Sequence, residues 1–345
     1  MGLLIGRAAL HRIRRVAPVL GIAAAVCGPA VGLETDQYYA WGRELADATE
    51  VLNAKVNLEI ASALERVNAR RSWERRSCPA VARRIASRFR WFIFHDLELW
   101  AANTALVERV PGDEEDELRF MREYLYHRTG LFDPGTKVPP SPTIEVGAVR
   151  FGTDKLAHFF SQGWKYYDSY RRGRRSGLGR EAAERRAIRR GIRPERTVLG
   201  YTWGIFSLAD LEANHAGMRF FIDLCEGQAP VLQKDSSGWR QARRFDFREH
   251  VAPEWDESFQ VSIFGRRRWE RVRGVLLGHC PMLHDPTVAR QRADYRSRDR
   301  ETVTEEEIGR LVRAGSLPDP RRFSLESNCP VEDGDGPAGA SRPEN

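Results

Sequence analysis

The sequence contains little lysine, no internal repeat and, beyond its first 33 residues, no apolar run approaching the ~20 residues that a membrane-spanning helix needs. Only five of its 55 basic side chains are lysines, a bias typical of GC-rich coding rather than of a nucleic-acid-binding surface. Nucleic-acid binding requires basic residues gathered on one face of a recognisable module, and the sequence has no such module. We therefore expect neither a nucleic-acid partner nor a membrane span in the mature chain.

The motifs of several large enzyme classes are also missing. The sequence has no Gly-x-Ser-x-Gly, no His-Glu-x-x-His, no glycine-rich phosphate loop ending in Lys-Ser/Thr and no Gly-x-Gly-x-x-Gly. These absences exclude serine hydrolases with a nucleophile elbow, zinc proteases of the His-Glu-x-x-His type, P-loop nucleotidases and enzymes with that dinucleotide-binding turn. A catalytic function would have to use a different arrangement of side chains.

The N-terminal residues have the layout of a signal peptide. Four arginines and no acid precede the apolar stretch 16–26, and small residues follow at 30–32. We expect cleavage before Leu33, removal of residues 1–32 and export to the periplasm or beyond. The alternative is an uncleaved membrane anchor, although Pro18 and Pro29 interrupt the longer apolar stretch 16–33.

The cysteines that remain after this cleavage are Cys78, Cys225, Cys280 and Cys329. An even number in an oxidising compartment favours two disulfides, and three pairings are open. The alternative is four separate buried thiols. A zinc site at Cys280 is not favoured, because no second pair of cysteines lies at zinc-ligand spacing.

The hydrophobic periodicity predicts a mainly α fold, an irregular helical bundle with at most a small β-hairpin, in one domain over residues 33–331. Its expected parts are a long helical hairpin over 36–106, central helices over 153–226 and C-terminal helices over 264–314. Alternation around Gly147 predicts a small strand pair over 143–151. Residues 332–345 have almost no apolar content, so we expect a disordered tail.

Capping residues and apolar spacing set the bounds of the individual helices. Ser207 with Asp210 three residues later predicts a helix start, and Thr304 with Glu307 predicts another. The predicted helices span 36–69, 79–106, 117–127, 153–170, 180–190, 194–206, 207–225, 264–277, 287–297 and 304–314.

The most informative polar residues lie in the segment 151–164. Asp154, His158 and Gln162 fall at i, i+4 and i+8, which places them near one stripe of a helix. A carboxylate and an imidazole one turn apart can hold a divalent metal, or the carboxylate can orient the imidazole as a base. In the alternative interpretation, Asp154 only stabilises the helix N-terminus and His158 is a hydrogen-bonded core residue.

A second polar stripe lies on the helix predicted to begin after Ser207. Asp210 and Asn214 share a face with Gly217, and alanines beside them are small enough for another helix to approach closely. Capping alone accounts for Asp210, whereas Asn214 is a poor helix former at mid-helix. We predict that His158 and Asp210 lie close together, because two facing polar stripes can satisfy each other's hydrogen bonds.

The segment Asp154-Lys155-x-x-His158-Phe159 resembles a signature that opens a helix in VanZ-like proteins and in small YfiM-like bacterial envelope proteins. The segment Trp255-Asp256-Glu257-Ser258 is similar to one in uncharacterised exported proteins of GC-rich bacteria. The resemblance implies that Asp154, Lys155 and His158 belong to a site, and it implies no particular reaction. VanZ-like proteins span the membrane several times, so their topology is not expected here.

Two functions are consistent with these patterns. The first is a metal-assisted hydrolase or transferase acting on an envelope lipid or glycan, with Asp154, His158 and Asp210 as both catalytic residues and ligands of a divalent metal. Its expected substrate-binding residues are Lys155, Gln162 and Asn214. The second is a non-catalytic structural or binding protein of the envelope, in which the same residues form a polar lock between helices.

The other polar and aromatic residues favour structural roles. His215 points away from Asp210 on a helix, so we interpret it as structural or exposed. The charged segment 245–257 is expected to be a solvated loop, and its alternative is a part of the site. A set of aromatic side chains is expected to lie in the core, and the alternative is that they line a groove for a lipid or glycan. These residues are Trp164, Tyr166, Tyr167 and Tyr170.

Overall fold

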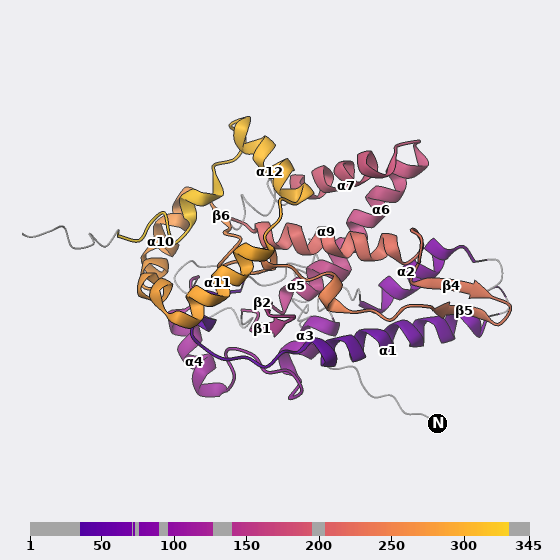
Figure 1. Ribbon diagram of the computed structural model, residues 1–345, viewed down its shortest axis with the longest axis horizontal. Helices are drawn as coiled ribbons and strands as arrows, with labels where there is room; N and C mark the ends of the chain where they lie inside the picture. Colours follow the sequence, from indigo (N-terminus) through magenta and orange to yellow (C-terminus); the bar gives the residue numbers. More distant parts are fainter. Residues whose placement is uncertain are drawn as a thin grey trace, which may run out of the picture. The chain divides into compact units, whose positions relative to one another are not determined.

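The computed structural model describes residues 35–70, 72, 76–89, 96–126, 140–194 and 204–330. The predicted signal peptide and the predicted disordered tail lie outside these residues. The described chain is mainly helical, as predicted, with small two-stranded antiparallel sheets (Figure 1). None of its helices combines the length and the apolar character needed to cross a membrane.

The N-terminal helices form a hairpin that is shorter than predicted. Helix α1 spans Thr49–Asn68 rather than starting at residue 36, because Tyr38–Ala40 form a 3-10 turn and the backbone then bends at Gly42, whose φ is 73°. The Asp47 carboxylate accepts a hydrogen bond from the Thr49 amide at the start of α1. Helix α2, Cys78–Phe89, packs against α1.

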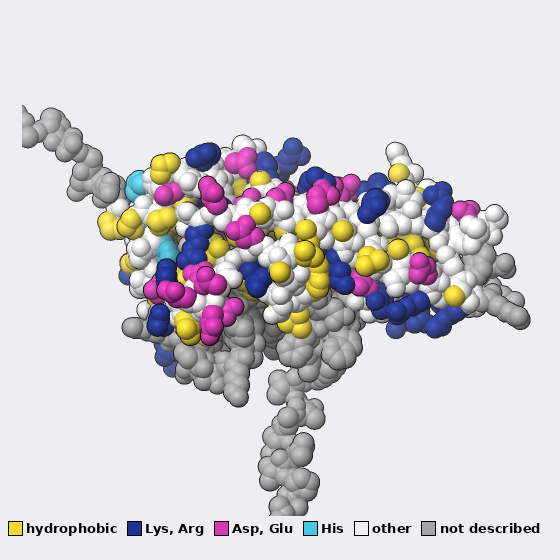
Figure 2. Space-filling view, turned by 90° about the horizontal axis from the view of Figure 1, so that it is seen from below, with side chains coloured by type: hydrophobic (Ala, Val, Ile, Leu, Met, Phe, Trp, Pro, Cys, Tyr) yellow, Lys and Arg dark blue, Asp and Glu magenta, His cyan; other side chains and the backbone are white. Residues whose placement is uncertain are grey.

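The predicted helix over 79–106 is two helices. Its first part is α2, and its second part is α3, Asp96–Asn103; residues 90–95 lie outside the described chain. Helix α4, Glu114–Glu123, starts three residues earlier than predicted, because the Asp113 side chain accepts a hydrogen bond from the Asp116 amide. Figure 2 shows acidic side chains gathered toward the end of the molecule that contains α4 in Figure 1.

The predicted strand pair is confirmed. Strands β1, Thr143–Val146, and β2, Val149–Gly152, pair antiparallel, and the turn residues Gly147 and Ala148 both have φ near 60°. Positive φ at both positions is the geometry that suits a two-residue hairpin. Strand β2 leads directly into the segment that carries Asp154 and His158.

That segment consists of three consecutive helical pieces. They are α5, Asp154–Ala157, a π-helical turn at His158–Gln162, and α6, Gly163–Arg175. Helix α7, Arg180–Pro194, and helix α9, Leu208–Asp223, both pack against α6 (Figure 1). The predicted cap of α9 is confirmed, because Ser207 Oγ accepts a hydrogen bond from the Asp210 amide at 3.2 Å.

Helices α6 and α9 touch through backbone atoms. A Cβ atom added to Gly163 would lie 2.7 Å from the Cα of Gly217, and a Cβ added to Gly217 would overlap the carbonyl oxygen of Phe159. Only glycine therefore fits at either position. This close approach places the polar stripe of α9 directly opposite the segment that contains His158.

The C-terminal part adds two further strand pairs and three helices. The pairs, neither of which was predicted, are β3, Ile205–Phe206, with β6, Ile263–Phe264, and β4, Leu232–Asp235, with β5, Gly238–Gln241. The helices are α10, Arg266–Leu277, α11, Pro286–Arg298, and α12, Val303–Arg313. Short 3-10 turns lie at Phe247–Glu249, Pro253–Trp255, Cys280–His284 and Pro320–Phe323.

One further predicted helix end and one further predicted helix start were wrong. The helix predicted over 194–206 ends in strand β3, and residues 195–203 lie outside the described chain. The capping box of α12 is formed by Thr302 and Glu305 rather than by Thr304 and Glu307. Thr304 and Glu307 are buried instead, and Glu307 forms an ion pair with an arginine of α7.

Two disulfides resolve the open question of cysteine pairing. Cys78 pairs with Cys225, which joins the first residue of α2 to the end of α9, and Cys280 pairs with Cys329. The alternative of four separate thiols is therefore wrong. Both bonds connect segments that are distant in sequence, by 147 and 49 residues respectively.

Candidate functional site

A buried lysine lies at the centre of the polar cluster. The Nζ atom of Lys155 is 2.6 Å from Asp154 Oδ2, 2.8 Å from Asp210 Oδ1 and 2.6 Å from Glu257 Oε1. The side chain of Lys155 has no exposed surface, whereas that of Asp210 is 11% exposed. Three segments that are far apart in sequence thus supply carboxylates to one ammonium group.

His158 lies at the more exposed edge of this cluster. Its Nε2 atom is 3.2 Å from Asp210 Oδ2, and its Nδ1 atom is 3.1 Å from Asn214 Oδ1. The structure thus brings His158 and Asp210 together, as predicted from the two polar stripes. Asn214 holds the ring from the other side, so the imidazole has a fixed orientation.

Hydroxyl groups donate to two of the carboxylates, at the Asp154 oxygen that Lys155 does not bind and at the Glu257 oxygen that it does. Thr35 Oγ1 donates to Asp154 Oδ1 at 3.0 Å, and Ser207 Oγ donates to Glu257 Oε1 at 3.0 Å. Space at this point is limited, since a Cβ on Gly152 would overlap both Thr35 Oγ1 and Asp154 Oδ1. The orientation of Asp154 therefore depends on a glycine at the end of β2.

The π-helical turn changes which side chains face the cluster. The Gly163 amide donates to the His158 carbonyl, five residues back, so the segment is wound more widely than an α-helix. Gln162 was predicted to share the stripe of Asp154 and His158, but it is only half-buried. Among the described residues no hydrogen bond joins Gln162 to the cluster. π-helical turns of this kind occur frequently at functional sites.

Burial and charge shift the acidity of the carboxylates. Burial raises the pKa of Glu257 to about 7, with Lys155 acting against the rise and Asp210 and Asp154 adding to it. Burial also raises the pKa of Asp210, but the positive charges of His158 and Lys155 outweigh it, and the net shift is downward. Asp210 therefore stays ionised within the cluster.

Glu98 on α3 is a further acid near the cluster. Burial, followed by the negative charge of Asp154, raises the pKa of Glu98 to about 8, while a hydrogen bond from Ser141 and the charge of Lys155 lower it. Ser141 Oγ donates to Glu98 Oε1 at 3.2 Å. At neutral pH Glu98 therefore holds a proton for most of the time.

Three of the predicted residues are positioned to share a metal ion. Asp154, His158 and Asp210 each offer one ligand atom, and these atoms lie within 4.8 Å of one another. Carboxylate oxygen and imidazole nitrogen are common ligands of divalent metals such as zinc. All three side chains are buried, and Asn214 would orient the imidazole ligand as outer hydrogen-bond partners of metal-bound histidines do.

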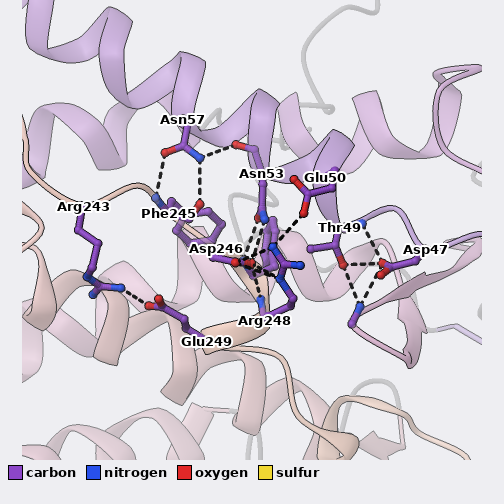
Figure 3. A network of polar contacts seen from close by, with 12 residues as sticks. Asp47, Thr49, Glu50, Asn53, Asn57, Arg243, Phe245, Asp246, Arg248 and Glu249 are labelled. Carbon is purple, nitrogen blue, oxygen red and sulfur yellow. Dashed lines mark hydrogen bonds and ion pairs between the residues drawn. The ribbon is translucent and has the colours of Figure 1, made fainter.

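The loop predicted to be solvated is buried over much of its length: Arg248 and Glu249 are exposed, but Phe245, Phe247 and residues 253–257 are buried. Asn53 and Asn57 of α1 hold its backbone through hydrogen bonds with Phe247 and Phe245, respectively (Figure 3). The charges of this loop pair among themselves and with α1, for example Arg248 with Asp246 and Glu50. The prediction was wrong because the two phenylalanines in this charged segment anchor it to the interior.

The same loop delivers Glu257, which the sequence analysis placed at the site only in its alternative interpretation of the segment 245–257. Trp255 packs its ring 5.1 Å from that of Phe151 and 5.8 Å from that of Phe159, and Glu257 follows two residues later. The resemblance of Trp255-Asp256-Glu257-Ser258 to other exported proteins was the one signal that could have identified it. Thr35 and Glu98 carried no signal in the sequence.

The remaining candidates are structural. His215 bonds to Glu184 of α7 at 2.9 Å, away from the cluster as predicted. The aromatic residues of α6 belong to the core and form no open groove: Trp164, Tyr166, Tyr167 and Tyr170 are all buried. Tyr167 lies between Trp164 and Phe221, with ring centroids 5.2 Å and 6.0 Å away.

Comparison with family models, with curated proteins and with solved structures finds no match for this chain.

Proposed function

We propose that the chain is an exported envelope protein whose buried cluster binds a divalent cation through Asp154, His158 and Asp210, and uses it to hydrolyse or transfer an ester or phosphoester group. The observation that carries the proposal is the convergence of three ligand atoms within 4.8 Å of one another beside a surplus of buried carboxylates. The two disulfides support an oxidising compartment.

The charge of the cluster favours a cation. Asp154, Asp210 and Glu257 carry three negative charges when ionised, and Lys155 supplies one positive charge. With Glu257 ionised and His158 neutral, a surplus of two negative charges would be buried, and uncompensated buried charge is strongly unfavourable. A divalent cation beside Lys155 would neutralise the surplus, whereas without it the cluster must retain protons.

The exposed fractions of the ligand side chains are consistent with water and substrate reaching the cluster from one side. His158 and Asp210 have side chains that are 7% and 11% exposed, while Asp154 and Lys155 are closed off. A bound cation would lower the pKa of a coordinated water and polarise the substrate. Lys155 would remain behind the ligands as a fixed positive charge that stabilises developing negative charge.

Elemental analysis of the purified mature protein tests the metal site. We expect about one divalent metal per chain in the wild type, and its loss in His158→Ala. His215→Ala is the matched control, because His215 is also bonded to a carboxylate but lies outside the cluster. Metal retained in His158→Ala, or absent from the wild type after incubation with zinc, manganese or magnesium, contradicts the proposal.

Catalysis requires a separate assay. Chromogenic esters and phosphodiesters report hydrolysis without knowledge of the natural substrate, and we expect activity that a chelator abolishes and added metal restores. Asp210→Asn should lose that activity, because the substitution removes one anionic ligand. Metal binding without any hydrolytic or transfer activity would leave a metal-binding protein and contradict the enzymatic part.

A polar lock between helices is the second candidate, and one observation favours it. The ammonium of Lys155 already has three carboxylate partners at 2.6 to 2.8 Å and no exposed surface. Such a network would orient α5, α9 and the loop that carries Glu257 without any ligand. If the lock is its whole function, the wild type should bind no stoichiometric metal, and His158→Ala should change stability alone.

A further inference from the structure

A groove between α1 and α2 is lined by arginines. Its two connected hollows have volumes of about 630 and 160 Å³ and share Arg76, Arg84 and Ser87. The arginines that line it are Arg66, Arg70, Arg76, Arg83, Arg84 and Arg88. None of the described residues that line it is acidic.

The basic character of the groove follows from the amphipathic pattern of α2. The helix buries Val81, Ile85 and Phe89 on one face and carries Arg83 and Arg84 on the other, and it contains no acid. Figure 2 shows a row of Lys and Arg side chains toward the end of the molecule where α1 and α2 lie in Figure 1.

Most of these arginines have no carboxylate partner in the described chain. Arg88 pairs with Glu59 at 2.5 Å, but no described carboxylate lies within 4.0 Å of Arg66, Arg70, Arg83 or Arg84. The Nε atom of Arg76 is buried without a hydrogen-bond partner among the described residues. Like charges gathered in this way repel one another. An anion bound in the groove would reduce this repulsion, which the described carboxylates leave largely uncompensated.

The groove is held in a fixed shape. Cys78, the first residue of α2, is joined to Cys225 at the end of α9. At the other end Arg88 of α2 pairs with Glu59 of α1, which joins the two helices. Guanidinium groups on rigid helices are suited to bind the oxygens of a phosphoryl group, and Arg makes such contacts in a bidentate manner.

We propose that this groove is a binding site for phosphoryl groups, carried by an anionic lipid headgroup or by a small soluble phosphate compound. Its larger volume falls in the range of small-ligand sites. A nucleic acid is disfavoured because none of the described residues that line the groove is aromatic, so none of them offers a ring for base stacking. The site is independent of the metal cluster, since the two share no residue.

Binding assays on the mature chain test the proposal and distinguish the two sources. Inorganic pyrophosphate, measured by calorimetry at low salt, is the soluble probe. Phosphatidylcholine vesicles with and without phosphatidic acid, measured by co-sedimentation, are the lipid probe. The site is supported if either probe binds and its binding weakens as the salt concentration rises. The probe that binds shows whether the phosphoryl group comes from a soluble compound or from a lipid headgroup. Binding to neither probe overturns the proposal.

The double variant Arg83→Gln/Arg84→Gln locates the binding. We expect it to weaken binding by about tenfold or more, because two charge-assisted contacts are lost. Arg266→Gln/Arg267→Gln on α10 removes the same charge from another exposed surface and should change affinity by about twofold or less. Thermal unfolding checks that both variants fold. Equal losses in the two variants, or tighter binding of a single-stranded oligonucleotide than of either probe, would overturn the proposal.

Discussion

Gly217 of α9 contacts the backbone of Phe159 so closely that any side chain at position 217 would overlap the Phe159 carbonyl oxygen. His158 precedes that contact by one residue, and Asn214 lies one helical turn before Gly217. The distance between the two polar stripes is therefore set by a glycine contact. The cluster depends on this packing as much as on its own hydrogen bonds.

Gly217→Ala should separate the two halves of the cluster. We expect a loss of about 1 to 3 kcal/mol in the free energy of unfolding, the usual cost of overpacking, together with weaker metal binding. Denaturant unfolding and metal titration measure the two effects. Gly274→Ala on α10 is the control, since a Cβ there meets no atom within 4 Å and should be neutral or slightly stabilising. Equal effects of both substitutions would contradict the packing argument.

Lys155→Met should leave three buried carboxylates without their cation. With metal removed from both proteins by a chelator, we expect the variant to have a free energy of unfolding about 3 to 5 kcal/mol below that of the wild type. The loss should shrink as pH falls, because protonation removes the uncompensated charges. Urea unfolding at pH 5 and pH 8 measures it. Lys165→Met, at an exposed position of α6, should cost at most about 0.5 kcal/mol; a similarly small cost at Lys155 would show that the ammonium does not hold the cluster together.

A second buried acid predicts a dependence of stability on pH. Burial, with the charges of Glu305 and Glu254, raises the pKa of Glu212 to about 8, against a hydrogen bond from Thr302. The folded state then retains a proton that the unfolded state releases above its ordinary carboxyl pKa. Stability should fall as pH rises from about 5 to about 8. Burial raises the pKa of Glu98 to about 8 and those of Glu254 and Glu257 to about 7, which adds to the same trend.

Glu212→Gln should reduce the fall in stability between pH 5 and pH 8 without abolishing it. The amide is neutral at every pH and can still accept the hydrogen bond from Thr302 Oγ1. We expect the variant to be more stable than the wild type at pH 8 by about 1 to 3 kcal/mol, and close to it at pH 5. Unfolding curves at the two pH values measure this difference. Parallel pH profiles for the two proteins would show that Glu212 does not hold a proton in the folded state.

Export and disulfide formation can be tested on one sample. Protein recovered from a bacterial periplasm should begin at Leu33 and should react with no thiol reagent when unfolded without reductant. Intact-mass spectrometry before and after alkylation measures both properties. Recovery with Met1 in place, or alkylation of four cysteines, would contradict export to an oxidising compartment.

Local signals in the sequence predicted the elements on either side of the cluster. The Ser207 cap and the hairpin around Gly147 depend on residues only a few positions apart, and both form as expected. The convergence of His158 and Asp210 followed from two polar stripes that each needed a partner. The cap and the hairpin are encoded within single turns, whereas the convergence was inferred from the polar stripes of two separate helices.

The features that could not be predicted depend on contacts between distant residues. Lys155 meets Glu257 across 102 positions, and Thr35 meets Asp154 across 119. Neither acid nor hydroxyl differs in its local sequence from a solvated one. The overlapping capping patterns at Thr302 and Thr304 are similarly undecided locally. In the structure Thr302 is the N-cap, and Thr304 lies buried in the first turn of α12.

Anomalous diffraction from crystals grown with zinc or manganese tests the central claim most directly. The account predicts a single strong peak about 2.0 to 2.3 Å from a carboxylate oxygen of Asp154, a carboxylate oxygen of Asp210 and Nε2 of His158. It also predicts that the peak is lost in His158→Ala crystals. Crystals without a peak at these three residues, in which Lys155 still binds all three carboxylates, would contradict a metal centre and leave the polar lock.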